Sequence, residues 1–337
     1  MKEKKRRLQL VMLSLVVSVL LMSIKFAAYY LTGSKAILTD ALESIINVVA
    51  AGFAYYSIYL SSKPKDENHP YGHGKIEFFS AGFEGALIGF AGLFMIVESV
   101  QAFFNPNDLQ GLPLGALILS STIFVNVGLG YLLKKEGEKQ NSLTLKADGQ
   151  HLLVDALSST VIVIGAFLIY FTNYFVLDSV FSILFALYIL FNGYRLVRQS
   201  VAGLMDEVDP KTFNKVVKAL NNHRRKNWID VHNLRIQKYG ADLHVDCHLT
   251  LPFYFNLETV HDEIQLLEEC LESISSHNVE VFTHADPCIP GKCCAYCRVT
   301  DCVFREEESL LNIPWNKTNL GKNQKHYLEI SQLGKKK

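Results

Sequence analysis

Charged side chains are nearly missing from six long stretches in the first 200 residues of this 337-residue chain. The bulk composition, with 49% hydrophobic residues and a formal net charge of zero, would suit a soluble protein of two domains. The distribution excludes that class, because almost all of the charge lies in loops and in the last third of the sequence. A membrane span needs about 20 apolar residues. Six stretches meet this length: Leu8–Tyr30, Ala36–Leu60, Phe78–Phe104, Leu112–Leu133, Leu143–Phe171 and Tyr174–Val197.

Basic residues are almost missing from every second loop between these stretches. The N-terminal arm and the second and fourth loops together carry twelve Lys and Arg, whereas the alternate loops carry Lys35 alone. Because Lys and Arg gather in cytoplasmic loops, we expect both termini in the cytoplasm and the chain in the cell (cytoplasmic or inner) membrane. The first stretch also lacks a convincing small-residue cleavage site, which argues against a cleaved signal peptide.

Cysteine is absent before Cys247, and all seven cysteines lie on the expected cytoplasmic side, where thiols or metal ligands are favoured over disulfides. Near the C-terminus, a C-x-x-C pair followed five residues later by another cysteine is typical of a thiolate metal site. The second C-x-x-C pair of a strong signal is missing, so plain reduced thiols stay the alternative. The candidate ligands are Cys288, Cys293, Cys294, Cys297 and Cys302. A peptide of residues 286–305 is expected to bind Zn(II), and the polar segment 288–337 is expected to be flexible.

The apolar stretches do contain a few ionisable residues, which are costly inside a membrane and therefore indicate function. His151 and Asp155 stand four residues apart, so that on a helix they share one face and can reach one ion. Glu43 and Asn47 have the same spacing in the second stretch, so two helices can supply four ligands to one metal. The alternative is that these are polar residues at a helix entry, hydrogen-bonded to neighbouring helices. The third stretch carries three glutamates without ligand spacing, interpreted as inter-helix or interfacial polar residues: Glu77, Glu84 and Glu98.

A polar loop separates the second and third stretches. Asp66, His69 and His73 lie in it within eight residues and can hold a cation at the membrane surface. A loop of this polarity is more often simply solvated, and that alternative stays open.

A soluble α+β domain is expected after the sixth stretch. Alternation and amphipathic spacing predict the order α-β-β-α-β, with helices packed on one face of a short sheet. Leu243, Val245, Cys247, Leu249 and Leu251 are expected to face one way, toward the core. The elements are expected at Phe213–His223, Ile229–Tyr239, Asp242–Leu251, Leu257–Ile274 and Val279–Thr283. This domain also concentrates possible metal ligands: His232, His248, His261, His284 and Asp286.

Taken together, residues 8–287 resemble the cation diffusion facilitator family, six-helix metal exporters with a cytosolic, metallochaperone-like (ferredoxin-like) domain. The resemblance rests on His151-x-x-x-Asp155, the segment around Glu43, Gly72-His73-Gly74-Lys75 and His284-Ala285-Asp286-Pro287. It implies a transport site between helices 2 and 5, a homodimer, and exchange of protons for metal. It also implies a loop site, cytosolic sites at the dimer interface on the residues above, and a charge pair between Lys75 and Asp206 near the dimer contact.

Helix 2 departs from the family pattern, which usually has His or Asp at the position of Glu43 and Asp at that of Asn47. The four-ligand set then holds three oxygen donors and one imidazole. This composition keeps Zn(II), Fe(II), Mn(II) and Co(II) open as transported metals, with Zn(II) favoured for the cytosolic domain.

The expected function is therefore efflux of divalent transition-metal ions by a secondary transporter, not an enzyme. No H-E-x-x-H motif or nucleophile–base pair accompanies the buried ligands, which argues against a metalloenzyme. The alternative function is a membrane-anchored metal sensor without transport. The expected partners are a second copy, the lipid bilayer, metal ions and protons, with no nucleic acid. The expected domains are 1–205 for transport, 206–287 for metal sensing and dimerisation, and 288–337 as the cysteine-containing tail.

Overall fold

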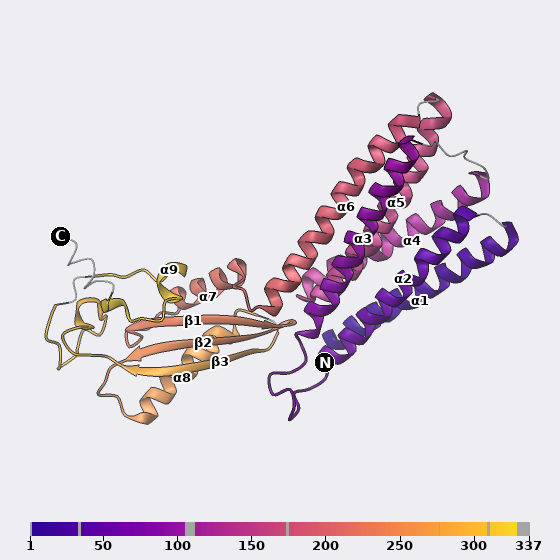
Figure 1. The fold of residues 1–337 in the computed structure, drawn as a ribbon. Coiled ribbons are helices and arrows are strands. Elements are labelled where there is room, and N and C mark those ends of the chain that lie inside the picture. Colours follow the sequence, from indigo (N-terminus) through magenta and orange to yellow (C-terminus); the bar gives the residue numbers. More distant parts are fainter. Residues whose placement is uncertain are drawn as a thin grey trace. The chain divides into compact units, whose positions relative to one another are not determined.

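The computed structural model describes residues 2–32, 35–104, 112–172, 175–275, 277–308 and 311–328. The chain forms two compact units, Met1–Met205 and Asp206–Lys337. Within the first unit the structure confirms the six expected helices (Figure 1): α1 Lys2–Thr32, α2 Lys35–Ser61, α3 Ile76–Phe104, α4 Leu112–Lys139, α5 Leu143–Thr172 and α6 Phe175–Leu204. Among the described residues, Lys4–Leu31, Ala41–Ser61, Ile76–Gln101 and Val180–Leu204 are each long and apolar enough to cross a membrane.

Glycines let the helices of the first unit approach one another closely. Helix α3 packs along α6, and α4 along α5. A Cβ atom added at Gly193 of α6 would lie 2.7 Å from the backbone N of Gly89 and 2.8 Å from the carbonyl O of Gly85. One at Gly149 of α5 would lie 2.7 Å from the carbonyl O of Gly130 on α4. Small residues at such contacts are how membrane helices gain van der Waals packing. Gly149 stands two residues before His151, so this contact fixes the start of α5.

A buried ion pair joins the ends of several helices. The Glu77 carboxylate at the start of α3 accepts a hydrogen bond from Arg7 Nη1 of α1 at 3.0 Å. It also accepts from Ser61 Oγ of α2 at 3.2 Å and from Ser142 Oγ, just before α5, at 2.5 Å. Removing one partner of a buried pair costs about 3–5 kcal/mol. Arg7 is therefore a structural cation as well as part of the basic N-terminal arm.

The second unit has the α-β-β-α-β order that the sequence predicts. Its elements are α7 Pro210–Asn222, β1 Asp230–Tyr239, β2 Asp242–Leu251, α8 Leu257–Glu272 and β3 Val279–Pro287. The three strands lie side by side with β2 in the middle (Figure 1), β1 antiparallel to it and β3 parallel. The five expected inward residues of β2 all lie in one core with residues of α7 and α8. Strand β3 runs four residues beyond the predicted end at Thr283, because it pairs with β2 along its whole length.

The segment after β3 differs from the expected flexible tail in the residues that the structure describes. It contains a short 3-10 helix, Cys294–Tyr296, and the helix α9, Lys317–Leu320. Trp315 and Leu320 are buried in the core of the second unit. Asn221 Nδ2 of α7 donates to the carbonyl O of Trp315 at 2.8 Å, and the Arg224 guanidinium lies over the Trp315 ring. A few apolar side chains in a polar sequence are enough to anchor this segment, which composition alone did not indicate.

Candidate metal-binding sites

The predicted transport-site residues of α2 and α5 lie in hydrogen-bond contact. Asn47 Nδ2 donates to Asp155 Oδ2 at 2.7 Å, and His151 Nε2 lies 3.2 Å from Asn47 Oδ1. His151 Nε2 and Asp155 Oδ2 are 3.7 Å apart, as expected for positions i and i+4 of a helix. The structure therefore brings an imidazole, an amide and a carboxylate from two helices to one point.

These separations suit a metal ion. A tetrahedral ion with ligand bonds of about 2.0–2.1 Å holds its ligand atoms roughly 3.4 Å apart. The distances from His151 Nε2 to Asn47 Oδ1 and to Asp155 Oδ2 lie on either side of that value. Small side-chain rotations would let an ion replace the hydrogen bonds of the metal-free arrangement.

Glu43, the fourth predicted ligand, has an exposed side chain on α2 one turn before Asn47. Its carboxylate is close enough to His151 to act on it electrostatically. Glu43 is the most solvent-accessible member of the predicted quartet, and its part in the site stays a prediction.

Two buried carboxylates beside this site were not predicted as part of it. Glu84 of α3 is completely buried, and its Oε2 lies 3.4 Å from His151 Nδ1. Asp148 lies one turn before His151 and is 2% exposed. A carboxylate on the second nitrogen of a ligating histidine fixes the ring's orientation and tautomer. The only sequence signal for Glu84 was a carboxylate well inside an apolar stretch, because its partner lies on another helix.

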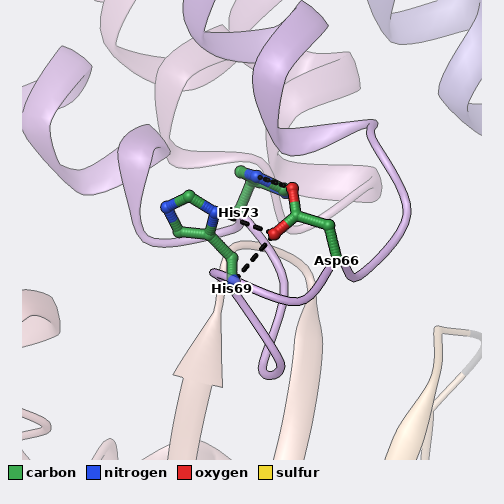
Figure 2. Close-up of side chains that lie close together, drawn as sticks. All are labelled: Asp66, His69 and His73. Atoms are coloured by element: carbon green, nitrogen blue, oxygen red, sulfur yellow. Dashed lines mark hydrogen bonds and ion pairs between the residues drawn. The ribbon is translucent and has the colours of Figure 1, made fainter.

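The loop between α2 and α3 gathers Asp66, His69 and His73 (Figure 2). Asp66 Oδ1 lies 3.0 Å from His69 Nδ1, and Asp66 Oδ2 lies 3.2 Å from His73 Nε2. One ligand atom from each lies within 4.8 Å of the other two. Asp66 and His69 are exposed, so an ion held here would complete its shell with water.

A second group of ligands lies on the sheet of the soluble unit. Strand register places His232 opposite His248, and His248 opposite His284, in one row across β1, β2 and β3. Asp286, two residues along β3, completes the group: its Oδ2 lies 3.2 Å from His248 Nδ1 and 3.4 Å from His232 Nε2. His232, His248 and Asp286 offer ligand atoms within 4.8 Å of one another, and His284 Nε2 lies 3.8 Å from Asp286 Oδ1. We call these four residues the sheet site.

The electrostatics of the sheet site favour neutral imidazole. Burial lowers the pKa of His232, against the opposing effect of Asp230 and Asp286. A histidine must be neutral to bind a metal, so His232 is in its ligating form near neutral pH. Lys325, from the segment after β3, places its Nζ 3.5 Å from Asp286 Oδ1.

Other predicted residues lie elsewhere. His261 is exposed on α8, and the described part of the chain does not bring it to the sheet site. The five C-terminal cysteines are free thiols that line one cavity after β3. Lys75 precedes α3 in the first unit, and Asp206, with φ +54°, begins the second. Their predicted pairing stays a prediction.

Comparison with known proteins gives the same domain order. Residues 11–205 match the cation efflux transmembrane domain, and residues 208–288 match the cytoplasmic domain of cation efflux proteins. An uncharacterized transporter of Synechocystis sp. is 30% identical over 267 residues, covering 79% of this chain and 86% of the relative. The cation-efflux pump FieF of Serratia proteamaculans is 26% identical over 275 residues, covering 80% and 89%. Metal tolerance protein C1 of Arabidopsis thaliana is 28% identical over 280 residues, covering 77% and 58%. The chain therefore belongs to the cation efflux (cation diffusion facilitator) family of multi-pass membrane transporters.

Proposed function

We propose that this protein is a homodimeric secondary transporter that moves divalent transition-metal ions out of the cytoplasm in exchange for protons. The observation that carries the proposal is the contact of His151, Asn47 and Asp155 between α2 and α5 at distances that suit an ion. Glu43 is the proposed fourth ligand. Zn(II), Fe(II), Mn(II) and Co(II) are the candidate substrates, because three oxygen donors and one imidazole suit this series.

Proton exchange follows from competition for the same atoms. A ligating imidazole must be neutral and a ligating carboxylate ionised, so metal binding releases protons and protonation expels metal. His151, Asp155 and Glu43 can take part in this competition, whereas Asn47 is neutral in either state. If the site opens alternately to the two sides of the membrane, the competition becomes exchange.

The alternative is a membrane-anchored metal sensor without transport. An anchor needs no metal ligands within its spans, and ionisable residues there are costly. The buried side chains of His151, Glu84 and Asp148 therefore favour transport over anchoring.

We assign residues 1–205 to transport and residues 206–287 to metal sensing and dimerisation. The match of this second region to the cytoplasmic domain of efflux proteins supports the assignment. Metal at the sheet site, with Zn(II) as the proposed ion, would favour one geometry of the dimer and so bias the membrane helices. Lys75 and Asp206 are proposed to form a charge pair near the dimer contact, and a Lys75→Ala variant that transports and dimerises normally would remove that role.

Flux through purified protein in liposomes tests the proposal. A metal-sensitive dye inside the vesicles reports entry of each candidate metal, and a pH-sensitive dye reports proton movement in the opposite direction. We expect metal uptake that is driven by an imposed proton gradient and stops when an ionophore collapses it. Metal binding without uptake would favour the sensor, and uptake that is indifferent to the proton gradient would exclude exchange.

Reporter fusions test the proposed orientation. A reporter after Lys337 should be cytoplasmic and one inserted near Asn107 should be external, as the distribution of Lys and Arg predicts. Two reporters on the same side would contradict the three spans expected between them, and with them the six-span arrangement.

A further inference from the structure

The cysteine segment directly after β3 forms a small core of its own, outside the matched cytoplasmic domain, which ends at residue 288. Four of its cysteines contact one another and three apolar or aromatic side chains in a cluster separate from the main core: Cys288, Cys293, Cys297, Cys302, Ile229, Tyr296 and Val299. These four side chains line one cavity, whose other walls include Cys294, Phe253, Tyr254 and Phe304. Four thiols and an apolar wall thus surround a single space.

Backbone contacts hold this segment in shape. The N–H of Cys288 donates to the carbonyl O of Leu251 at 2.8 Å, which continues the pairing of β3 with β2. Gly291, with φ +74°, turns the chain back toward the 3-10 helix. Arg305 then closes the loop, because its guanidinium donates to the carbonyl oxygens of Cys294 and Cys297 at 3.4 Å each. The cysteines are therefore positioned by the fold and not by a disulfide.

The sulfur of Cys293 accepts two hydrogen bonds, from the Ile289 N–H at 3.3 Å and from the Tyr296 O–H at 3.6 Å. Hydrogen bonds of this kind stabilise negative charge on sulfur and help to set the properties of metal-bound thiolates.

The spacing of the sulfurs distinguishes two kinds of metal site. A single zinc ion with bonds of about 2.3 Å to sulfur holds its thiolates roughly 3.8 Å apart. Among the described residues, the loop triad and the sheet site contain three ligand atoms within 4.8 Å of one another, and the cysteines, all of them described, contain no such trio. Four sulfurs that surround one cavity at wider spacing suit a larger inorganic body.

We propose that Cys288, Cys293, Cys297 and Cys302 bind one iron–sulfur cluster of the four-iron, four-sulfide type. Such clusters take four cysteine thiolates as ligands, and the inorganic sulfide fills the space between thiolates that a single zinc ion would leave open. The phenyl groups of Phe253 and Phe304 limit access of water to it. This assignment replaces the single Zn(II) ion that the cysteine spacing predicts, and it is independent of the proposed transport function.

Cys294 is excluded from the ligand set and provides a matched control. Although Cys294 also lines the cavity, it lies outside the apolar cluster that contains the other four. Cys270, buried in the main core on α8, is a second control at a distance in sequence.

The test is a chemical analysis of the full-length protein, purified in detergent without oxygen. We expect about four iron and four acid-labile sulfide per chain, with visible absorption that bleaches on reduction. Cys297→Ala and Cys302→Ala should each lose most of the iron and sulfide, whereas Cys294→Ala and Cys270→Ala should retain them. As a test that does not depend on the folding of the ligand variants, wild-type protein stripped of metal is also reconstituted with ferrous iron and sulfide. Stoichiometric zinc without sulfide, or failure of wild-type protein to take up iron and sulfide, would overturn the proposal.

Discussion

The transport site and the sheet site contain similar elements in opposite electrostatic settings. Between α2 and α5, one imidazole meets an amide and a carboxylate, and buried Glu84 and Asp148 add negative charge nearby. On the sheet, three imidazoles meet a single carboxylate, and Lys325 adds positive charge. The first set favours harder, oxygen-preferring cations and the second favours zinc or copper.

The scaffolds of the two sites differ as well. The transport ligands lie on separate helices, which can move relative to each other and so release an ion. The sheet ligands lie on three hydrogen-bonded strands in register, which hold ligand geometry more firmly. A site that delivers metal needs weak, changeable ligation, and a site that reports metal needs a fixed response. The comparison therefore supports the proposal that the helices carry flux and that the strands carry sensing.

Loss of a transport ligand should have the largest effect. Asp155→Ala or His151→Ala is expected to abolish metal flux in liposomes, because the ion loses a charged or imidazole donor in a low-dielectric site. Zinc binding at the sheet site, measured by calorimetry on the same preparation, should stay unchanged. Glu98→Ala, which removes an exposed carboxylate of α3, is the matched control and should retain flux. Flux that persists in Asp155→Ala would mean that the transport site lies on other residues.

Exchange of the helix 2 ligands should change selectivity more than rate. Glu43→His with Asn47→Asp keeps the formal charge of the site while the new imidazole is neutral, and it supplies a softer donor. We expect the ratio of Zn(II) to Mn(II) flux to rise by roughly tenfold or more, which corresponds to about 1.4 kcal/mol. An identical metal profile would show that selectivity is set outside these four residues.

Loss of a sheet ligand should weaken sensing and leave maximal flux intact. Even outer-shell partners of a metal ligand contribute roughly 10–100-fold to affinity, so His232→Ala should lower zinc affinity of the full chain by at least that much. His223→Ala removes an exposed histidine at the C-terminal end of α7 and should change nothing. Equal losses in both variants would contradict the sheet site, since only His232 belongs to it.

The smallest effect concerns the residue that caps the N-terminus of α7. Asp209 caps α7 and accepts a hydrogen bond from Lys238 Nζ at 2.5 Å. Burial raises the pKa of Asp209, but the contacts from Lys238 and Thr212 outweigh this effect and lower the pKa to about 2, from 3.8. The stabilisation is present above pH 3.8 and is lost as the pH falls through about 2.

Asp209→Ala should therefore unfold more easily than wild type by about 1 kcal/mol at neutral pH, less in high salt because the pair is partly exposed. The difference should vanish near pH 2. Denaturant unfolding of the full chain, followed by fluorescence of the second unit's tryptophans, measures it. A difference that persists at low pH would assign the effect to something other than the ionised carboxylate. Metal binding at the transport site and at the sheet site should stay unchanged.

Much of this architecture could be predicted from sequence because it is local. Apolar length indicates α1 to α6, and alternation identifies the inward face of β2. His151 and Asp155 share a helix, so their proximity follows from spacing alone. Contacts between distant elements could not be found in this way: Glu84 approaches His151 from α3, and Trp315 joins a core formed mostly by residues before 280. His261 was included because the family resemblance implies a site at the dimer interface; within one chain it lies on α8, outside the sheet site, and its part in an interface site stays a prediction.

Lys325 affects how a metal ion can bind to the sheet site. Its neighbour His326 is held by Asp230, with a 2.9 Å hydrogen bond from the His326 backbone N–H to Asp230 Oδ2, and Lys325 Nζ also donates to the carbonyl O of Pro287 at 3.1 Å. The ammonium is thus a resident counter-ion for Asp286. A metal ion that binds the sheet site therefore competes with a tethered cation for this carboxylate, and the threshold concentration of the metal depends on how firmly that lysine is held.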